Sequence, residues 1–197
     1  ASDVYKRQIK AWSDALAIEP NRPDLRVKLA RAHYFLADSH IEMDDTRPEE
    51  ERQKEIVEHF KQGANQAELA LGQSYPGFRS AYCTKQNYKS QVQALDEKAL
   101  GGMYWYATNL GKYALKTSII EALSQKDRIK AMMTYIKEVE PGFFHHAADR
   151  YFGAFFTKIP FPKGDLPKSA KHFEASSSGS PHYLATKVLY AKMNALK

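Results

Sequence analysis

The sequence predicts an all-α fold of stacked antiparallel helical hairpins, and two observations support this prediction. First, a small residue follows a bulky apolar one inside three apolar helical segments. These pairs are Leu29-Ala30, Leu110-Gly111 and Phe152-Gly153. Second, prolines stand where the partner helices would end, at Pro20, Pro141 and Pro181. A small residue lets a partner helix approach closely, and proline ends a helix because it has no N–H to donate. One hairpin cannot bury its apolar face alone, so several must stack.

The predicted helices follow the apolar spacing along the chain. In chain order they cover residues 9–19, 24–43, 46–71, 86–94, 97–118, 125–140, 142–158, 167–178 and 182–195. The third is expected to start with Thr46 as its N-cap and Pro48 in its first turn, followed by acidic residues that suit a helix N-terminus. Residues 72–85 are the least regular part. Period-two alternation is missing, so no strand is predicted.

Composition narrows the class of protein. The chain has 197 residues, of which 43% are hydrophobic and 26% charged, as in an ordinary globular protein. Its one cysteine, Cys83, excludes an internal disulfide and a thiolate metal cluster. The formal net charge is +6, but the lysines are scattered at helical spacing, which favours a solvated surface over nucleic-acid binding.

The N-terminus suggests a division of the chain. Residues 1–8 look like a translated sequencing adaptor, the alternative being an ordinary basic first turn. Residues 9–197 are then expected to form a single helical-repeat domain, truncated at its N-terminus. Under this interpretation a missing signal peptide does not indicate a cytoplasmic protein.

Two stretches resemble a known family. The first is residues 104–114, which begin with the motif Tyr-Trp-Tyr-Ala-Thr-Asn-Leu-Gly, and the second consists of several segments between His146 and Ala191. Both are similar to the T component of tripartite ATP-independent periplasmic (TRAP) transporters, a tetratricopeptide-like helical family. The resemblance covers roughly residues 20–195 and implies a tetratricopeptide-like α-solenoid.

The resemblance implies a periplasmic lipoprotein that partners the solute-binding component of such a transporter. Contact with the membrane is expected only through a lipid anchor lost with the truncated N-terminus. A homo-oligomer, for example a trimer, is also compatible with the resemblance. A generic tetratricopeptide scaffold that binds peptide tails is the alternative function.

In tetratricopeptide-like hairpins, fixed offsets from the small residue place side chains in a concave groove. These offsets give Arg31, Tyr34, Trp105, Thr108, Lys112 and Arg150 as candidates for a partner or ligand groove. Asn109 is added because it lies on one helical stripe with Trp105 and Lys112. Of these, Trp105, Lys112 and Arg150 are expected to be partly exposed and to converge, since aromatic and arginine side chains often anchor protein contacts. The alternative is that Trp105 is buried between hairpins and Asn109 bonds a neighbouring loop.

Catalytic and metal-binding interpretations find little support in the sequence. A helix would bring His145 and Asp149 to one face, but no third metal ligand is apparent. The acidic runs at residues 44–45 and 49–51 suit a helix start. Cys83 has no catalytic signature, and Gly101-Gly102 follows no strand. We therefore predict no enzyme activity, no catalytic residues, no metal and no cofactor.

Overall fold

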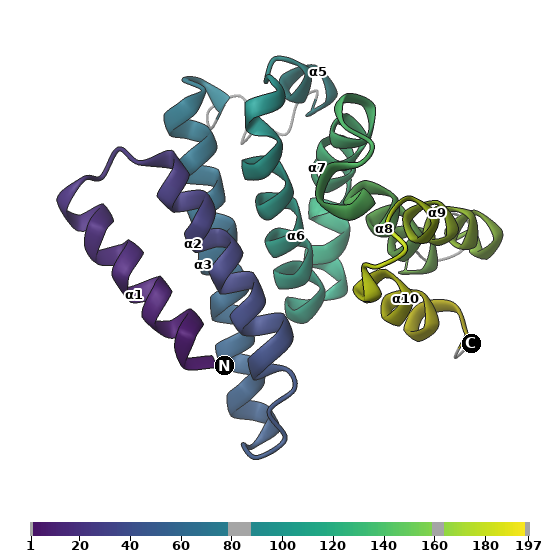
Figure 1. Ribbon diagram of the computed structural model, residues 1–197, viewed down its shortest axis with the longest axis horizontal. Coiled ribbons are helices and arrows are strands. Elements are labelled where there is room, and N and C mark those ends of the chain that lie inside the picture. The colour runs from purple at the N-terminus through teal and green to yellow at the C-terminus, as the bar shows by residue number, and fades with distance from the viewer. Residues whose placement is uncertain (1, 79–87, 159–163, 196–197) are drawn as a thin grey trace. The chain divides into compact units, whose positions relative to one another are not determined.

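The computed structural model describes residues 2–78, 88–158 and 164–195. Within these ranges the chain is helical and contains no strand, which confirms the predicted all-α class. In chain order the elements are α1 (Ser2–Ile18), α2 (Pro23–Phe35), η1 (Leu36–Ile41), α3 (Glu49–Ser74), α5 (Tyr88–Gln93), η2 (Glu97–Ala99), α6 (Leu100–Thr117), α7 (Ile119–Val139), α8 (Phe143–Lys158), α9 (Leu166–Gly179), α10 (Leu184–Tyr190) and η3 (Ala191–Ala195) (Figure 1). The chain divides into two compact units, Ala1–Met132 and Met133–Lys197.

Prolines end four of these helices in the same way. The last helical residue stands two positions before the proline in α1, α3, α7 and α9, which precede Pro20, Pro76, Pro141 and Pro181. Proline disfavours the helical conformation of the residue before it, so that residue is not helical and the helix ends two positions before the proline. The helix ends predicted just before Pro20, Pro141 and Pro181 are confirmed. The tetratricopeptide-like repeat and the single domain remain predictions.

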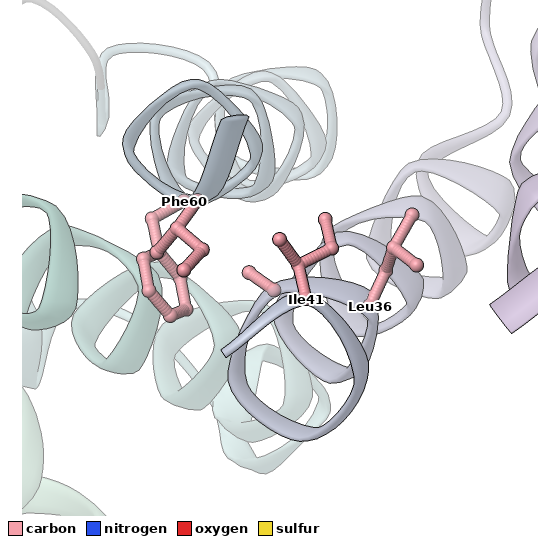
Figure 2. Close-up of a cluster of buried hydrophobic side chains, with 5 residues drawn as sticks. Leu36, Ile41 and Phe60 are labelled. Carbon is pink, nitrogen blue, oxygen red and sulfur yellow. The ribbon is translucent and has the colours of Figure 1, made fainter. Parts of the chain in front are cut away.

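The core of the first unit lies between α1, α2, α3 and α6. Helices α2, α3 and α6 pack against one another, and α1 packs against α2. Leu16, Leu25 and Leu29 form the buried contact between α1 and α2. At the other end of α2, the π-helical segment η1 continues the chain and packs Leu36 and Ile41 into a cluster with Phe60 of α3 (Figure 2). These contacts bury the apolar stripes that the sequence predicted.

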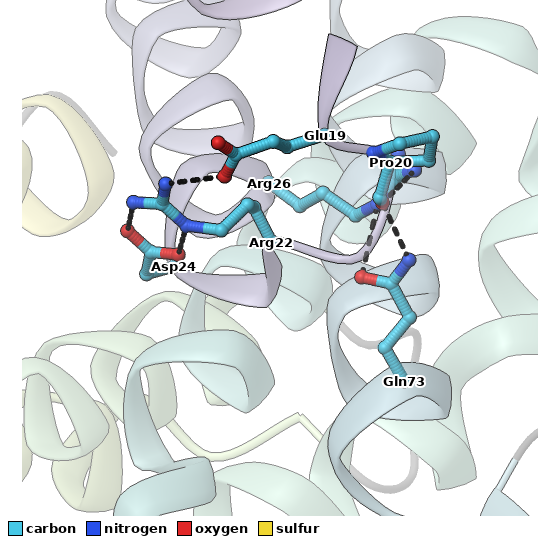
Figure 3. Close-up of polar contacts among 6 residues, drawn as sticks. All are labelled: Glu19, Pro20, Arg22, Asp24, Arg26 and Gln73. Carbon is cyan, nitrogen blue, oxygen red and sulfur yellow. Dashed lines mark hydrogen bonds and ion pairs between the residues drawn. The ribbon is translucent and has the colours of Figure 1, made fainter. Parts of the chain in front are cut away.

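Polar contacts fix the turn between α1 and α2 to the end of α3. The carbonyl of Pro20 accepts hydrogen bonds from Arg26 Nη2 at 3.1 Å and from Gln73 Nε2 at 2.9 Å (Figure 3). Arg26 also donates from Nε to Gln73 Oε1 at 3.1 Å. The side chains of α2 and α3 therefore satisfy a backbone group that the end of α1 leaves without a helical partner.

Two helix starts differ from the prediction. Helix α3 begins at Glu49 with Pro48 as its N-cap residue. Thr46 does not cap the helix, and its hydroxyl donates to Asp44 Oδ1 at 2.5 Å. Helix α7 begins at Ile119, six residues before the predicted start. Ser118 Oγ accepts a hydrogen bond from the backbone N–H of Glu121 at 3.0 Å, as an N-cap does. The spacing Ser-x-x-Glu is a capping-box signal that could have located this start.

The second unit is organised around the α8–α9 hairpin. A Cβ atom added at Gly153 of α8 would lie 2.7 Å from Phe173 Cδ2 of α9, so only glycine allows this approach. The Gly153 carbonyl also accepts a hydrogen bond from Ser169 Oγ at 2.7 Å. Close approach at Gly153 is therefore confirmed. At Gly111 it is not, because an added Cβ would make only an ordinary 3.5 Å contact with Ile129.

Candidate functional site

Tyr34 and Trp105, two of the predicted groove residues, meet in an aromatic cluster between α2 and α6. Their ring centroids are 5.6 Å apart, and Phe35 of α2 lies 5.7 Å from Trp105. Tyr34 also contacts Phe60 of α3 at 5.8 Å. Trp105 is only 5% exposed, because rings from α2 and from its own helix surround it. The expected partial exposure of Trp105 is therefore wrong, and the alternative of a buried Trp105 is confirmed.

Two cationic side chains border this cluster. Arg31 is exposed, and its guanidinium carbon lies 5.7 Å from the centre of the Phe35 ring. Lys112 of α6 forms an ion pair with Asp38 of η1, and its side chain is 40% exposed. We define the α2–α6 face as Arg31, Tyr34, Phe35, Asp38, Trp105 and Lys112. It combines an aromatic base, with Trp105 buried and Tyr34 and Phe35 half-buried, with a charged rim that solvent can reach.

Asn109 joins three helices and does not face solvent. Its Nδ2 donates to the carbonyl of Ala30 in α2 at 3.1 Å and to that of Trp105 in its own helix at 2.7 Å. Its Oδ1 lies where a Cβ of Gly63 in α3 would be, and it has no hydrogen-bond partner. Asn109 therefore bonds a neighbouring helix, α2, and not the loop named in the alternative.

Thr108 is half-buried and contacts its own helix. Its hydroxyl donates to the carbonyl of Tyr104 at 2.9 Å, as threonine often does inside helices. We place it outside the α2–α6 face. Its predicted role in a groove stays a prediction.

Arg150 belongs to the second unit and is also buried, at 8% exposure. Its Nη1 donates to the carbonyl of His145 at 2.7 Å and its Nη2 to that of Phe144 at 3.2 Å. The guanidinium carbon lies 4.7 Å from the centre of the Tyr183 ring. The expected partial exposure of Arg150 is therefore wrong, because backbone carbonyls and an aromatic ring enclose its charge. Its convergence with Lys112 stays a prediction.

The carbonyls that Arg150 binds belong to an unusual stretch of backbone. Phe144, His145 and His146 have φ angles of 42°, 60° and 55°, in the left-handed region that residues other than glycine rarely adopt. His145 stacks on Tyr183 with ring centroids 4.4 Å apart. The prediction that His145 and Asp149 share a helical face is wrong, because the backbone at His145 and His146 is left-handed and interrupts the helix.

Asp149 instead takes part in an ion cluster that the sequence did not predict. It is 5% exposed, and its Oδ1 accepts from Lys137 Nζ at 2.6 Å and from His172 Nδ1 at 2.7 Å. His172 stacks on Phe156, with centroids 5.7 Å apart. The cluster connects α7, α8 and α9 within the second unit. No spacing rule connects residues so far apart in sequence, so it could not have been predicted.

A second missed pair connects α2 and α3. The Nδ1 atoms of His33 and His59 lie 2.8 Å apart, and burial lowers the pKa of both imidazoles, that of His33 to about 4. His33 follows the buried Leu29 and Ala30 at helical spacing, and this could have placed His33 on the inner face of its helix. Its partner could not be identified from sequence.

The remaining chemical candidates are a metal site, the Gly101-Gly102 pair and Cys83. Within residues 2–78, 88–158 and 164–195, no group of three histidine, cysteine or acidic side chains could hold a metal. Gly102 packs on Leu71, where an added Cβ would lie 2.9 Å from Leu71 Cδ2. Cys83 lies outside the described residues. The described helices also include none that is long and apolar enough to cross a bilayer.

Comparison with known proteins identifies one relationship. A model of the family described as TRAP transporter T-component matches residues 8–197. No curated protein matches the chain. The family match covers nearly the whole chain and includes both units.

Proposed function

The chain belongs to the TRAP transporter T-component family, and from this premise we propose that it docks the solute-binding component of a TRAP transporter. The family is an accessory part of a transport system and not a class of enzyme. We place the protein in the periplasm, held by a lipid anchor, as a monomer or a homo-oligomer such as a trimer. The family match is the observation that carries this proposal.

The α2–α6 face supports docking in chemical terms. Arginine and aromatic side chains are enriched at protein interfaces, and this face presents Arg31 and Lys112 over a rigid aromatic base. Because Trp105 is buried, it would hold the base in place and the exposed cations would contact the partner. An acidic surface on the solute-binding component fits this arrangement.

Binding of the purified solute-binding component tests the proposal. We expect measurable affinity for the wild-type chain by calorimetry, and a loss of about tenfold for Arg31→Glu combined with Lys112→Glu. The matched control is Lys28→Glu combined with Lys61→Glu, which reverses the charge of two other exposed lysines, one on α2 and one on α3.

The outcomes separate the general proposal from the face assigned to it. If the wild-type chain does not bind the solute-binding component, the docking function is wrong. If it binds and both double variants lose affinity equally, the α2–α6 face has no special part in docking.

A further inference from the structure

Four large aliphatic side chains are exposed at one bend of the first unit. We define the α6–α7 tip as Leu115, Ile119, Ile120 and Leu123, whose exposures range from 48% to 77%. They lie within nine residues, on either side of Ser118, where α6 ends and α7 begins (Figure 1). Single exposed apolar residues are common, but such a group around one bend is typical of an interaction site.

An acidic segment lies beside the tip. Lys116 of α6 pairs with Glu42 at 2.8 Å and donates to Gln53 Oε1 at 3.0 Å, which brings residues 42–53 next to the end of α6. Residues 42–51 contain six acidic side chains and one basic one. The whole chain carries +6, so this concentration of negative charge is opposite to the overall balance. Met43, in the same segment, is 69% exposed.

We propose that the α6–α7 tip and its acidic border form a second docking element, which inserts into an apolar pocket bordered by lysine or arginine on a partner protein. The partner is the solute-binding component, so this inference rests on the proposed function. The tip supplies apolar area, and the acidic border selects a basic rim and steers the encounter.

The negative charge of the acidic border favours a protein partner over a lipid surface. Anionic headgroups attract basic segments, whereas residues 42–51 would be repelled by them. The tip also lacks the tryptophan and tyrosine residues that favour the membrane interface. A basic, apolar protein surface satisfies both the aliphatic side chains and the carboxylates.

The test compares the binding of the purified solute-binding component to variants of the full chain. Ile119→Ser with Ile120→Ser should weaken binding at least about tenfold. Asp45→Asn with Glu49→Gln and Glu51→Gln should weaken it several-fold, mainly through a slower association rate, and this loss should shrink at high salt. Circular dichroism would show that the variants remain folded.

Helix α10 offers a matched control. Leu184 and Val188 are 66% and 65% exposed, but their neighbour Lys187 is basic. Leu184→Ser with Val188→Ser should therefore leave the affinity unchanged. Unchanged affinity of the Ile119/Ile120 variant in a wild-type chain that binds would overturn this inference alone. The inference would also be overturned if the Ile119/Ile120 variant no longer sedimented with phosphatidylglycerol vesicles while its affinity for the partner stayed unchanged. The same holds if that variant no longer self-associated in analytical ultracentrifugation but still bound the partner.

Discussion

His33 of α2 and His59 of α3 share one hydrogen bond between Nδ1 atoms that lie 2.8 Å apart. Such a bond needs one Nδ1 that carries a proton and one that does not, so protonation of the second ring removes it. Burial lowers the pKa of His33 to about 4, and the neighbouring His59 adds to the effect while Glu58 opposes it. Burial also lowers the pKa of His59, and there Glu55 raises the pKa while Lys6 lowers it. The pair therefore holds α2 and α3 together in its neutral form.

This pair predicts a pH dependence of stability. The folded-state pKa of His33 is below the ordinary value of 6.5, so the unfolded chain binds more protons between pH 6.5 and about 4. The contribution of the neutral His33 to the free energy of unfolding is fully present above pH 6.5. It is lost as the pH falls towards 4, and the loss amounts to up to about 3 kcal/mol. Urea unfolding at several pH values measures this loss. It should be smaller in His33→Gln, whereas His182→Gln, at an exposed site, should behave like wild type.

The contact between Gly63 and Asn109 predicts a strong dependence on side-chain size. Gly63→Ala places a methyl group on the Asn109 amide, and we expect the free energy of unfolding to fall by about 1–3 kcal/mol. Asn109→Ala should cost a similar amount, because the Ala30 carbonyl loses its donor. In the double variant the loss of stability should be much smaller than the sum of the two single losses. Full additivity would show that the two residues do not interact.

Gly153 and Gly111 offer a matched comparison within helices. Gly153→Ala drives a methyl group into the Phe173 ring and should lower stability by about 1–3 kcal/mol. Gly111→Ala meets only an ordinary contact, so its better helix propensity should leave stability unchanged or raise it by up to about 1 kcal/mol. Thermal unfolding of the two variants checks the prediction. An equal effect at both sites would contradict the close approach of α8 and α9.

Arg150 predicts a requirement for a guanidinium group. Its nitrogens bind the carbonyls of Phe144 and His145, where the backbone is left-handed. A lysine cannot reach both carbonyls with the same planar geometry, so Arg150→Lys should lower stability by about 1.5–3 kcal/mol. The exposed Arg31→Lys serves as the control and should change stability by less than about 0.5 kcal/mol. If the Arg150→Lys variant is as stable as the wild-type chain in chemical unfolding, the left-handed stretch needs no support from the guanidinium group.

The fold could be predicted further than the site. Proline positions and apolar stripes indicate helix ends and inner faces, because both act within a few residues. They correctly predict the all-α class and the close approach at Gly153. The burial of Trp105 and Arg150 could not be predicted from their offsets, since it depends on rings and carbonyls contributed by other helices or by left-handed backbone. The histidine pair and the Asp149 cluster depend in the same way on distant partners.

The bond from Asn109 to Ala30 joins residues 79 positions apart and has a consequence for folding. The Nδ2 group of Asn109 reaches the Ala30 carbonyl only when α2 and α6 are both in place, and the side chain fits only against Gly63 of α3. These helices therefore gain their full stability together, as one cooperative unit. Their amide hydrogens should exchange with solvent at a common slow rate, limited by a single opening of the three helices.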